Sequence, residues 1–293
     1  MILRPQDVYV YRDLGPILPG IPTRWSPRKT ECDKSSDHLA SDRVIIMVKY
    51  RRDNDSMSLR SSTAMSISEL LCALFIKNIG LECFEPVMVH VNDHYALSCR
   101  HDSSFSYTVI PGLHYGSIFV DDLSPAPEKV YDILERPDDL LRLWVLDSWL
   151  YNIDRATYGN AMLRKFNGKN ILIAADQSDC FGGAISFSDD SFYSKNSCRC
   201  VDQLKDFGRI ILDYGVDSMH DTADKIRYCV LNIQKYMDIV PNQWWIDSQI
   251  DKDHVMEYLS IRSDKLADIC DFRRWEGAQD AIRGGTHIQP RIL

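Results

Sequence analysis

The sequence lacks an excess of positive charge. Its 293 residues carry 34 Lys and Arg against 42 Asp and Glu, which gives a formal net charge of −8 at pH 7. Proteins that bind nucleic acid usually present a basic surface to the phosphate backbone. The composition therefore argues against direct nucleic-acid binding.

Long apolar runs and a cysteine framework are also missing. A transmembrane helix needs about 20 consecutive apolar residues, and no run approaches that length; the first residues, MILRPQDVYVYRDLG, lack the apolar core of a signal peptide. The nine cysteines are scattered, and the closest pair, Cys198 and Cys200, has no second pair or nearby His to complete a zinc site. We expect reduced cysteines in a cytoplasmic protein without a membrane partner.

Glycine is missing where a nucleotide-binding protein would use it. No glycine-rich phosphate loop stands directly before the strongest strand candidate, Val44 to Tyr50. Ser35 and Ser36 are the remaining candidates there for holding a phosphate, through their backbone N–H groups and hydroxyls. The polar composition of this segment also fits an ordinary solvated loop, which it favours about twofold.

The chain has enough apolar residues for a substantial core, with 45% hydrophobic and 26% charged residues. Strand patterns dominate before the linker at Pro125 to Pro127, and helical patterns dominate after it. The change predicts an α+β protein with an N-terminal strand-rich lobe and a C-terminal, mainly helical lobe. The boundary falls between about residues 92 and 125, and we set it at residue 100, so that the lobes cover residues 1–100 and 101–293.

Lys49 and Glu69 are the charged residues of interest in the first lobe. Lys49 lies near the end of the Val44 to Tyr50 strand, where a lysine is usually a solvated flank. A helix is expected from Met65 to Gly80, capped by Ser66 or Ser68, with Glu69 in its first turns among apolar residues. A glutamate in that setting either points to solvent or meets a cation, and Lys49 is the nearest candidate.

Two further strands are expected after this helix. Cys83 to Val91 and Tyr95 to Cys99 are short runs rich in apolar residues, and Asn92-Asp93 between them is suited to a turn. The pattern predicts that the two strands complete the N-terminal sheet.

A hairpin is predicted in the second lobe. The strands would be Ala161 to Lys165 and Asn170 to Ala175, joined by Asn167-Gly168, since a type I′ turn needs two central residues with φ > 0. Pairing outward from this turn places Asn160 opposite Ala175 and beside Asp176. Asp154 enters the same end of the hairpin from the preceding loop.

This combination of side chains suits phosphoryl transfer. That chemistry uses a carboxylate to orient the attacking hydroxyl, here Asp154, and an Asn with an Asp to hold Mg²⁺ on the phosphates, here Asn160 and Asp176. The alternative is a surface hairpin whose polar ends are simply solvated.

The same stretch resembles the HipA-like kinase family, a branch of the protein-kinase-like fold. Members carry an apolar-aromatic helix that ends in a Trp-x-x-Asn-x-Asp-Arg segment, then an Asn, a hydrophobic strand ending in Asp, and Phe-Gly-Gly. The matching residues here are Trp149, Asn152, Asp154, Arg155, Asn160, Asp176, Phe181, Gly182 and Gly183. Asp154 and Asn160 are six residues apart in this chain, whereas five separate the corresponding kinase residues.

The resemblance implies a two-lobed protein-kinase-like fold and an ATP- and Mg²⁺-dependent transfer of phosphate to a Ser or Thr of a protein. It implies that Lys49 contacts the nucleotide phosphates and pairs with Glu69, and that the partners are a nucleotide and a protein substrate or partner protein. A degenerate kinase-fold module, which binds nucleotide or nothing and works as an interaction or regulatory subunit, is the alternative. A small-molecule kinase on the same fold also fits the sequence.

Overall fold

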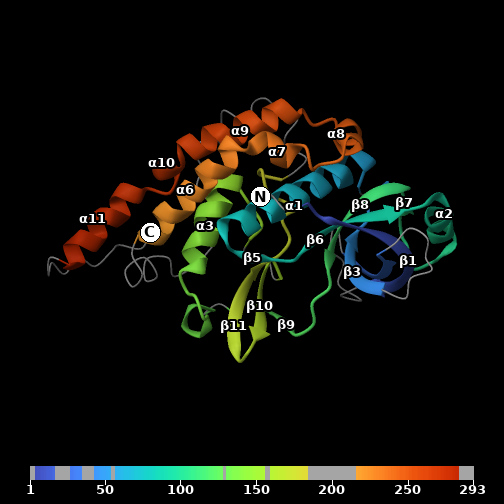
Figure 1. Ribbon diagram of the computed structural model, residues 1–293, viewed down its shortest axis with the longest axis horizontal. Coiled ribbons are helices and arrows are strands. Elements are labelled where there is room, and N and C mark those ends of the chain that lie inside the picture. Colours follow the sequence, from blue (N-terminus) through green and yellow to red (C-terminus); the bar gives the residue numbers. More distant parts are fainter. Residues whose placement is uncertain are drawn as a thin grey trace. The chain divides into compact units, whose positions relative to one another are not determined.

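The computed structural model describes residues 4–16, 27–34, 43–53, 57–127, 130–155, 159–183 and 216–283. It divides the chain into two units, whose elements are labelled in Figure 1. The first unit comprises Met1–Leu74, Phe84–Asp121 and Lys235–Asp251. The second comprises Phe75–Cys83, Asp122–Gln234 and Lys252–Leu293.

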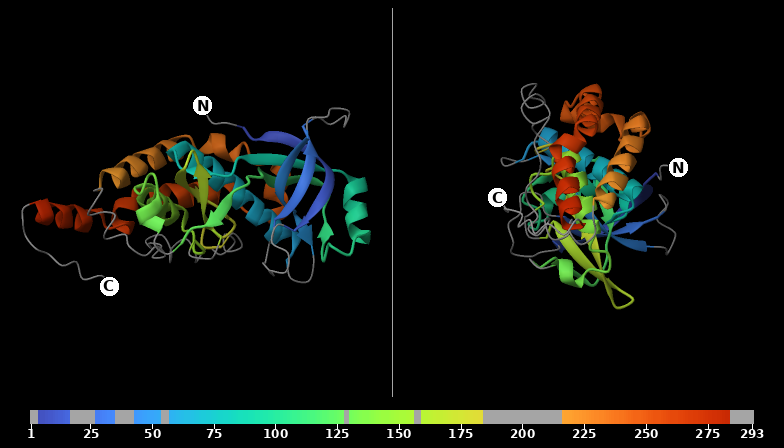
Figure 2. Two further views of the ribbon diagram at one scale, coloured as in Figure 1. Left: turned by 90° about the horizontal axis from the view of Figure 1, so that it is seen from below. Right: turned by 90° about the vertical axis from the view of Figure 1, so that its left-hand side faces the viewer.

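Five strands of the first unit form a closed barrel in the order β1-β2-β3-β8-β6, seen from the side in the left view of Figure 2. Neighbouring strands are antiparallel, except that β1 and β6 run parallel where the barrel closes. The strands are β1 (Gln6–Pro16), β2 (Arg28–Asp33), β3 (Arg43–Lys49), β6 (Pro86–Val91) and β8 (Gly112–Ile118).

The barrel interior is filled by small and β-branched side chains. Val8, Ile46, Val48 and Val89 are buried in it, as expected for strands with one face toward a core. Close packing inside the barrel requires a glycine at position 116 of β8, because a Cβ added there would stand 2.6 Å from Val89 and 2.7 Å from Ile46. Strand β3 (Arg43–Lys49) confirms the strand expected at residues 44–50.

Helix α1 (Leu59–Ile79) follows this strand. It begins six residues before the expected Met65, because the Oγ of Ser58, rather than Ser66 or Ser68, accepts the N–H of Ser61 at 3.1 Å. The helix is long and apolar enough to cross a membrane, contrary to the expectation of no such run. However, 83% of its most apolar window is buried inside the protein, as in the core helix of a folded domain.

Residues 95–99 are helical, so the strand expected there is wrong. They belong to α2 (Asp93–His101), and the Asn92 side chain caps this helix by accepting the N–H of Tyr95 at 2.7 Å. Ala96 and Cys99, three residues apart, form its buried side. Asn92-Asp93 fits a turn as well as a helix start, because capping and turn residues are the same types. The lobe limit predicted at residue 100 falls inside α2, and the first unit continues to Asp121.

Smaller elements complete the first unit. Two short strands pair with each other, and a helix from late in the sequence belongs to the same unit. They are β4 (Arg52–Asp53), β7 (Thr108–Val109) and α8 (Asn242–Ser248), which follows α7 (Ile233–Met237).

The second unit holds a four-stranded sheet in the order β5-β11-β10-β9. Its central hairpin has the predicted register: Phe166 faces Lys169, and the connecting residues Asn167 and Gly168 have φ of 50° and 78°. The strands are β5 (Glu82–Cys83), β9 (Leu123–Pro125), β10 (Ala161–Phe166) and β11 (Lys169–Ala174).

Helices make up most of what the structure describes of the rest of the second unit. The apolar-aromatic helix that the family resemblance implies before the Asp154 loop is present as α3 (Asp139–Leu150), and Trp149 near its end is fully buried, with its indole N–H donating to the Leu259 carbonyl at 2.9 Å. Arg262 closes the end of α3 by donating to the carbonyls of Trp149 and Ser148. The others are η1 (Val130–Ile133), α6 (Asp217–Leu231), α9 (Lys252–Asp264), α10 (Leu266–Ile269) and α11 (Phe272–Arg283).

Candidate phosphotransfer site

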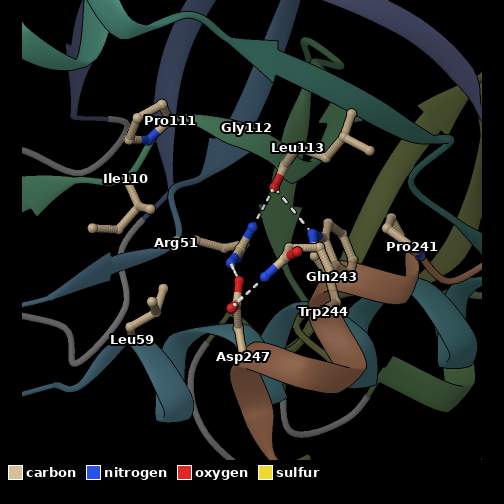
Figure 3. Close-up of a pocket in the computed structure, with 10 residues that line it drawn as sticks. All are labelled: Arg51, Leu59, Ile110, Pro111, Gly112, Leu113, Pro241, Gln243, Trp244 and Asp247. Carbon is tan, nitrogen blue, oxygen red and sulfur yellow. Dashed lines mark hydrogen bonds and ion pairs between the residues drawn. The ribbon is translucent and has the colours of Figure 1, made fainter.

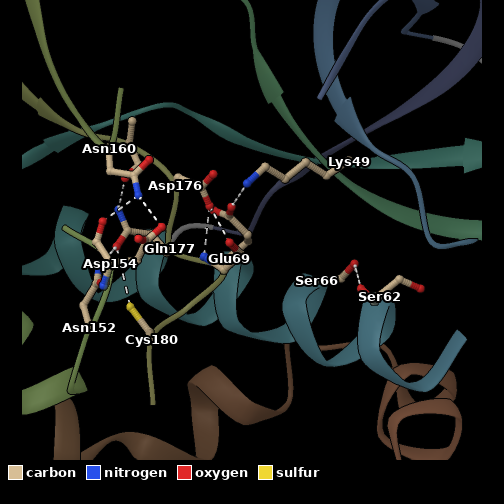
Figure 4. A network of polar contacts seen from close by, with 12 residues as sticks. Lys49, Ser62, Ser66, Glu69, Asn152, Asp154, Asn160, Asp176, Gln177 and Cys180 are labelled. Carbon is tan, nitrogen blue, oxygen red and sulfur yellow. Dashed lines mark hydrogen bonds and ion pairs between the residues drawn. The ribbon is translucent and has the colours of Figure 1, made fainter. Parts of the chain in front are cut away.

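The loop that carries Asp154 begins where α3 ends. Tyr151, the C-cap, adopts the left-handed conformation with φ 49°, which turns the chain out of the helix. The buried Asn152 then accepts the N–H of Asp154 through its side-chain oxygen at 3.0 Å. This local bond fixes the backbone at Asp154 while its side chain stays half-buried (Figure 4).

Asn160 lies against Asp154 despite the longer spacing between them. Its Nδ2 donates to the Asp154 carboxylate Oδ2 at 2.9 Å and to the Asp154 backbone carbonyl at 2.7 Å. Its own carbonyl accepts the N–H of Ala175 at 3.1 Å, which is the pairing expected from the hairpin register. Asp176 follows directly, so the end of the hairpin holds Asp154, Asn160 and Asp176, termed the hairpin-end cluster below.

Arg155 organises the backbone around this cluster. Its guanidinium is fully buried and forms a two-point ion pair with Asp147 of α3, at 2.8 and 3.0 Å. The same group donates to the carbonyl of Asn160, to the carbonyl of Ala175 at 2.6 Å and to the side chain of Gln177 at 2.7 Å. Arg155 thus connects α3 to the residues next to the open ends of β10 and β11, Asn160 and Ala175.

Burial governs the ionisation of the Asp147–Arg155 pair. Desolvation raises the pKa of the Asp147 carboxyl, and the adjacent guanidinium opposes that rise. On Arg155, desolvation is outweighed by the charge and hydrogen bonds of Asp147, so its pKa is raised. The geometry is that of an ionised pair, because the planar guanidinium donates to both carboxylate oxygens and its other N–H groups donate to carbonyl and amide oxygens.

Asp176 sits on a sharp backbone turn. Its φ of 47° is in the left-handed region, which is uncommon outside glycine. Its Oδ1 accepts from the Ser178 hydroxyl at 2.6 Å and from the Ser178 N–H at 3.2 Å. The turn and these two bonds fix the direction of the carboxylate (Figure 4).

The Phe-Gly-Gly segment anchors the chain that follows Asp176. The N–H of Phe181 donates to Leu150 at 2.6 Å, and the N–H of Gly182 donates to Tyr151 at 2.8 Å. The Phe181 ring is fully buried and meets Tyr258 of α9 edge-on. The segment is therefore attached to the end of α3, next to the start of the Asp154 loop.

Lys49 and Glu69, in the first unit, form the predicted ion pair. Lys49 is the last residue of β3 and Glu69 lies in α1, and the Lys49 Nζ donates to the Glu69 Oε1 (Figure 4). Lys49 is 6% exposed and Glu69 is 3% exposed. Glu69 therefore meets a cation instead of pointing to solvent.

Sequence reasoning missed two residues and proposed two that the structure does not describe. Asp147 looked like one more polar position on an apolar helix, and the only signal for it was a carboxylate among the apolar residues of α3, which ends before Arg155. Gln177 gave no signal, because its role depends on the fold of the hairpin end. Ser35 and Ser36 lie outside the described residues.

The hairpin-end cluster offers oxygen atoms suited to a hard cation. Asn160 is oriented through its Nδ2, and no residue that the structure describes donates to its Oδ1. An amide oxygen with the Asp176 carboxylate is too small a set to bind a metal ion alone, and among the described residues no group of three or more His, Cys, Asp or Glu could do so. The set fits Mg²⁺, which takes one or two protein ligands and fills its shell with phosphate oxygens and waters.

The fold is kinase-like, as a comparison with solved structures shows. The solved structure of the proinflammatory kinase CtkA from Helicobacter pylori matches this chain with a TM-score of 0.57 and 13% sequence identity, over 94% of this chain and 98% of that chain. At this identity the likeness concerns the fold, which is a mixed α+β, kinase-like fold with a strand-rich N-terminal region and a helical C-terminal part. No family model matches the sequence, and no curated protein matches it.

Proposed function

We propose that the protein is an ATP- and Mg²⁺-dependent kinase of the HipA-like kind that phosphorylates a Ser or Thr hydroxyl of another protein. The observation that carries this proposal is the hydrogen bond from Asn160 to the Asp154 carboxylate, beside Asp176. A solvated surface hairpin would have no need for a fixed carboxylate, an oriented amide and a carboxylate on a strained turn in one place.

Asp154 has the role of orienting the acceptor hydroxyl. Its half-buried carboxylate is held from two sides, by the Asn152 bond to its backbone N–H and by the Asn160 bond to its side chain. It accepts the hydroxyl proton as the hydroxyl oxygen bonds to the γ-phosphorus and the bond from that phosphorus to the β–γ bridging oxygen breaks, releasing ADP. Such positioning lowers the barrier because the reacting atoms start near their reactive geometry.

Asn160 and Asp176 are the residues that would hold Mg²⁺, through the Oδ1 of Asn160 and the carboxylate of Asp176. When bound, the ion neutralises charge on the phosphate oxygens. Arg155 contributes indirectly, because it fixes the carbonyls of Asn160 and Ala175 and so the directions in which these two side chains leave the backbone.

Lys49 is assigned to the nucleotide phosphates, with Glu69 as its positioning partner. A lysine at the end of a strand is flexible, and a buried carboxylate restricts its ammonium to one position. The remaining assignments are a cytoplasmic location, a protein substrate or partner protein, and no nucleic-acid or membrane partner.

A degenerate kinase-fold module is the competing function, and the missing glycine-rich loop before β3 favours it. The experiment that separates the two is a measurement of melting temperature and phosphate transfer with ATP and Mg²⁺ on the full chain. ATP with Mg²⁺ at 100 times its Kd should stabilise the protein by about 2.7 kcal/mol, and Mg²⁺ alone should not. Binding without transfer to itself or to casein would favour the module, and no stabilisation would contradict nucleotide binding altogether.

A further inference from the structure

A pocket of about 370 Å³ lies within the first unit, at residues that have no part in the proposed phosphotransfer (Figure 3). Its walls come from the turn between β7 and β8, from the first residue of α1 and from α8. Pro111, Gly112 and Gln243 on its rim are exposed, so the pocket is open to small molecules. Its volume is within the range of about 300–1,000 Å³ found for small-molecule sites.

Apolar groups form most of the pocket wall. Leu59, Ile110 and Leu113 are half-buried around it. Figure 3 shows Leu59 and Ile110 on one side of Arg51 and Asp247, and the fully buried Trp244 on the other. The Trp244 indole N–H is already used, because it donates to the Leu113 carbonyl at 3.0 Å. The part of the pocket at Leu59 and Ile110 suits a flat, apolar ring.

Arg51 supplies hydrogen-bond donors inside the pocket. Its Nε donates to Thr63 at 3.0 Å, one Nη1 hydrogen goes to the Leu113 carbonyl at 3.2 Å, and one Nη2 hydrogen goes to Asp247. A guanidinium has five N–H groups, so two have no acceptor among the residues that the structure describes. Because Arg51 is 2% exposed, such donors are costly to leave unmatched.

Asp247 supplies acceptors next to these donors. One carboxylate oxygen accepts from Arg51, and the other accepts from the Gln243 side chain at 2.7 Å. A carboxylate has about four lone-pair sites, so acceptor capacity remains beside the free N–H groups. Its side chain is 17% exposed, which leaves it within reach of a molecule in the pocket.

The opposite charges of Arg51 and Asp247 select against charged ligands. An anion that meets Arg51 is repelled by the adjacent carboxylate, and a cation that meets Asp247 is repelled by the guanidinium. We propose that this pocket is a binding site for a small neutral molecule that joins an apolar ring to a primary carboxamide. The carboxamide oxygen accepts from Arg51, its NH₂ group donates to Asp247, and the ring lies against Leu59 and Ile110.

The experiment uses the full chain and benzamide as the probe, followed by saturation-transfer NMR and titration calorimetry. Benzoate and benzylammonium carry the same ring with one negative or one positive charge. Benzamide should bind, and each charged analogue should bind at least tenfold more weakly. Absence of benzamide binding, or equal binding of either analogue, would overturn the assignment; neither result bears on the phosphotransfer proposal, which involves other residues.

Two variants locate the binding. Leu59→Trp fills the pocket from its half-buried edge and should weaken benzamide binding at least tenfold, whereas Ile246→Trp, on the exposed side of α8 and outside the pocket, should stay within twofold. If Leu59→Trp does not fold, as judged by circular dichroism, Gln243→Trp at the exposed rim replaces it with the same expected loss. Unchanged binding in the folded pocket variant would place benzamide elsewhere and refute the site.

Discussion

The Nδ2 of Asn160 donates to the Oδ2 of Asp154 at 2.9 Å, although one residue more separates them than in the kinase catalytic loop. The bond is possible because Asn160 is positioned by its pairing with Ala175 at the end of the hairpin, and not by the length of the loop before it. The extra residue therefore does not prevent Asn160 from donating to Asp154 through its Nδ2 while its Oδ1 holds the proposed Mg²⁺.

Removing Arg155 should be one of the most damaging single changes in the second unit. Arg155→Met leaves the fully buried Asp147 without its ion pair, and breaking a buried pair costs about 3–5 kcal/mol. The free energy of unfolding, measured in urea, should fall by that amount. Arg227→Met, which breaks an exposed pair with Asp224 on α6, is the matched control and should stay within about 0.5 kcal/mol. Equal effects in the two variants would show that Arg155 does not organise the site.

The contribution of the Lys49–Glu69 pair to stability can be measured separately from the contribution of Lys49 to ATP binding. Lys49→Met should cost about 3 kcal/mol because it removes the cation that forms an ion pair with a buried carboxylate, and the double variant Lys49→Met with Glu69→Leu should regain most of that loss. ATP affinity, measured by calorimetry, should fall in both variants. Restored stability together with restored ATP binding would mean that Lys49 serves only as the counterion of Glu69.

Asp176 should be required for the metal-dependent part of nucleotide binding. Asp176→Ala removes the carboxylate that we propose as a Mg²⁺ ligand, so Mg²⁺ should no longer increase ATP affinity in this variant. Asp224→Ala, which removes an exposed carboxylate of α6 in the same unit, is the control and should keep the Mg²⁺ effect. An unchanged Mg²⁺ effect in Asp176→Ala would identify Asp176 as a structural end to the hairpin.

His114 should make the protein sensitive to mild acid. Its ring is buried in β8, accepts the Arg51 N–H at 2.7 Å and donates to the Ile110 carbonyl at 2.7 Å; burial, with a smaller contribution from Arg51, lowers its pKa to about 3. The unfolded chain binds this proton below a pH of about 6.5, so the contribution of His114 to stability is complete above that pH and is lost as pH falls toward 3.

The loss from His114 should reach about 2 kcal/mol at pH 5. Urea unfolding of wild type and His114→Gln at pH 7 and pH 5 tests this, and the variant should lose correspondingly less between the two pH values. His101→Gln, at an exposed residue of the same unit, should keep the wild-type slope. If the unfolding free energy of His114→Gln falls between pH 7 and pH 5 by as much as that of wild type, other groups cause the acid sensitivity.

The sequence was sufficient to predict the features that depend on local chemistry. Asn167-Gly168 sets the register of the hairpin, and that register places Asn160 opposite Ala175. For Glu69 among the apolar residues of α1, the local pattern left a solvated side chain and an ion pair open, and the family resemblance implied the Lys49–Glu69 pair that the structure contains. A short-range rule about turn φ values was enough for the hairpin alone.

Other features depend on contacts that no short stretch contains. Asn92 and Asp93 fit a turn or a helix start equally well, and the choice is made by Ala96 and Cys99 packing into the barrel core. Asp147 could not be assigned before the position of Arg155 was known. The pocket at Arg51 needs Asp247, 196 residues away in the sequence.

The central claim, that Asp154 acts in phosphate transfer, is tested most directly by Asp154→Ala in the full chain. Transfer to the protein itself or slow ATP hydrolysis is measured together with ATP affinity. Because the proposed role of Asp154 is to act on the acceptor hydroxyl and not on the nucleotide, the variant should lose transfer to background while its ATP affinity stays within a few-fold of wild type. Transfer by Asp154→Ala at the wild-type rate, or a wild type with no transfer above background, would contradict the account.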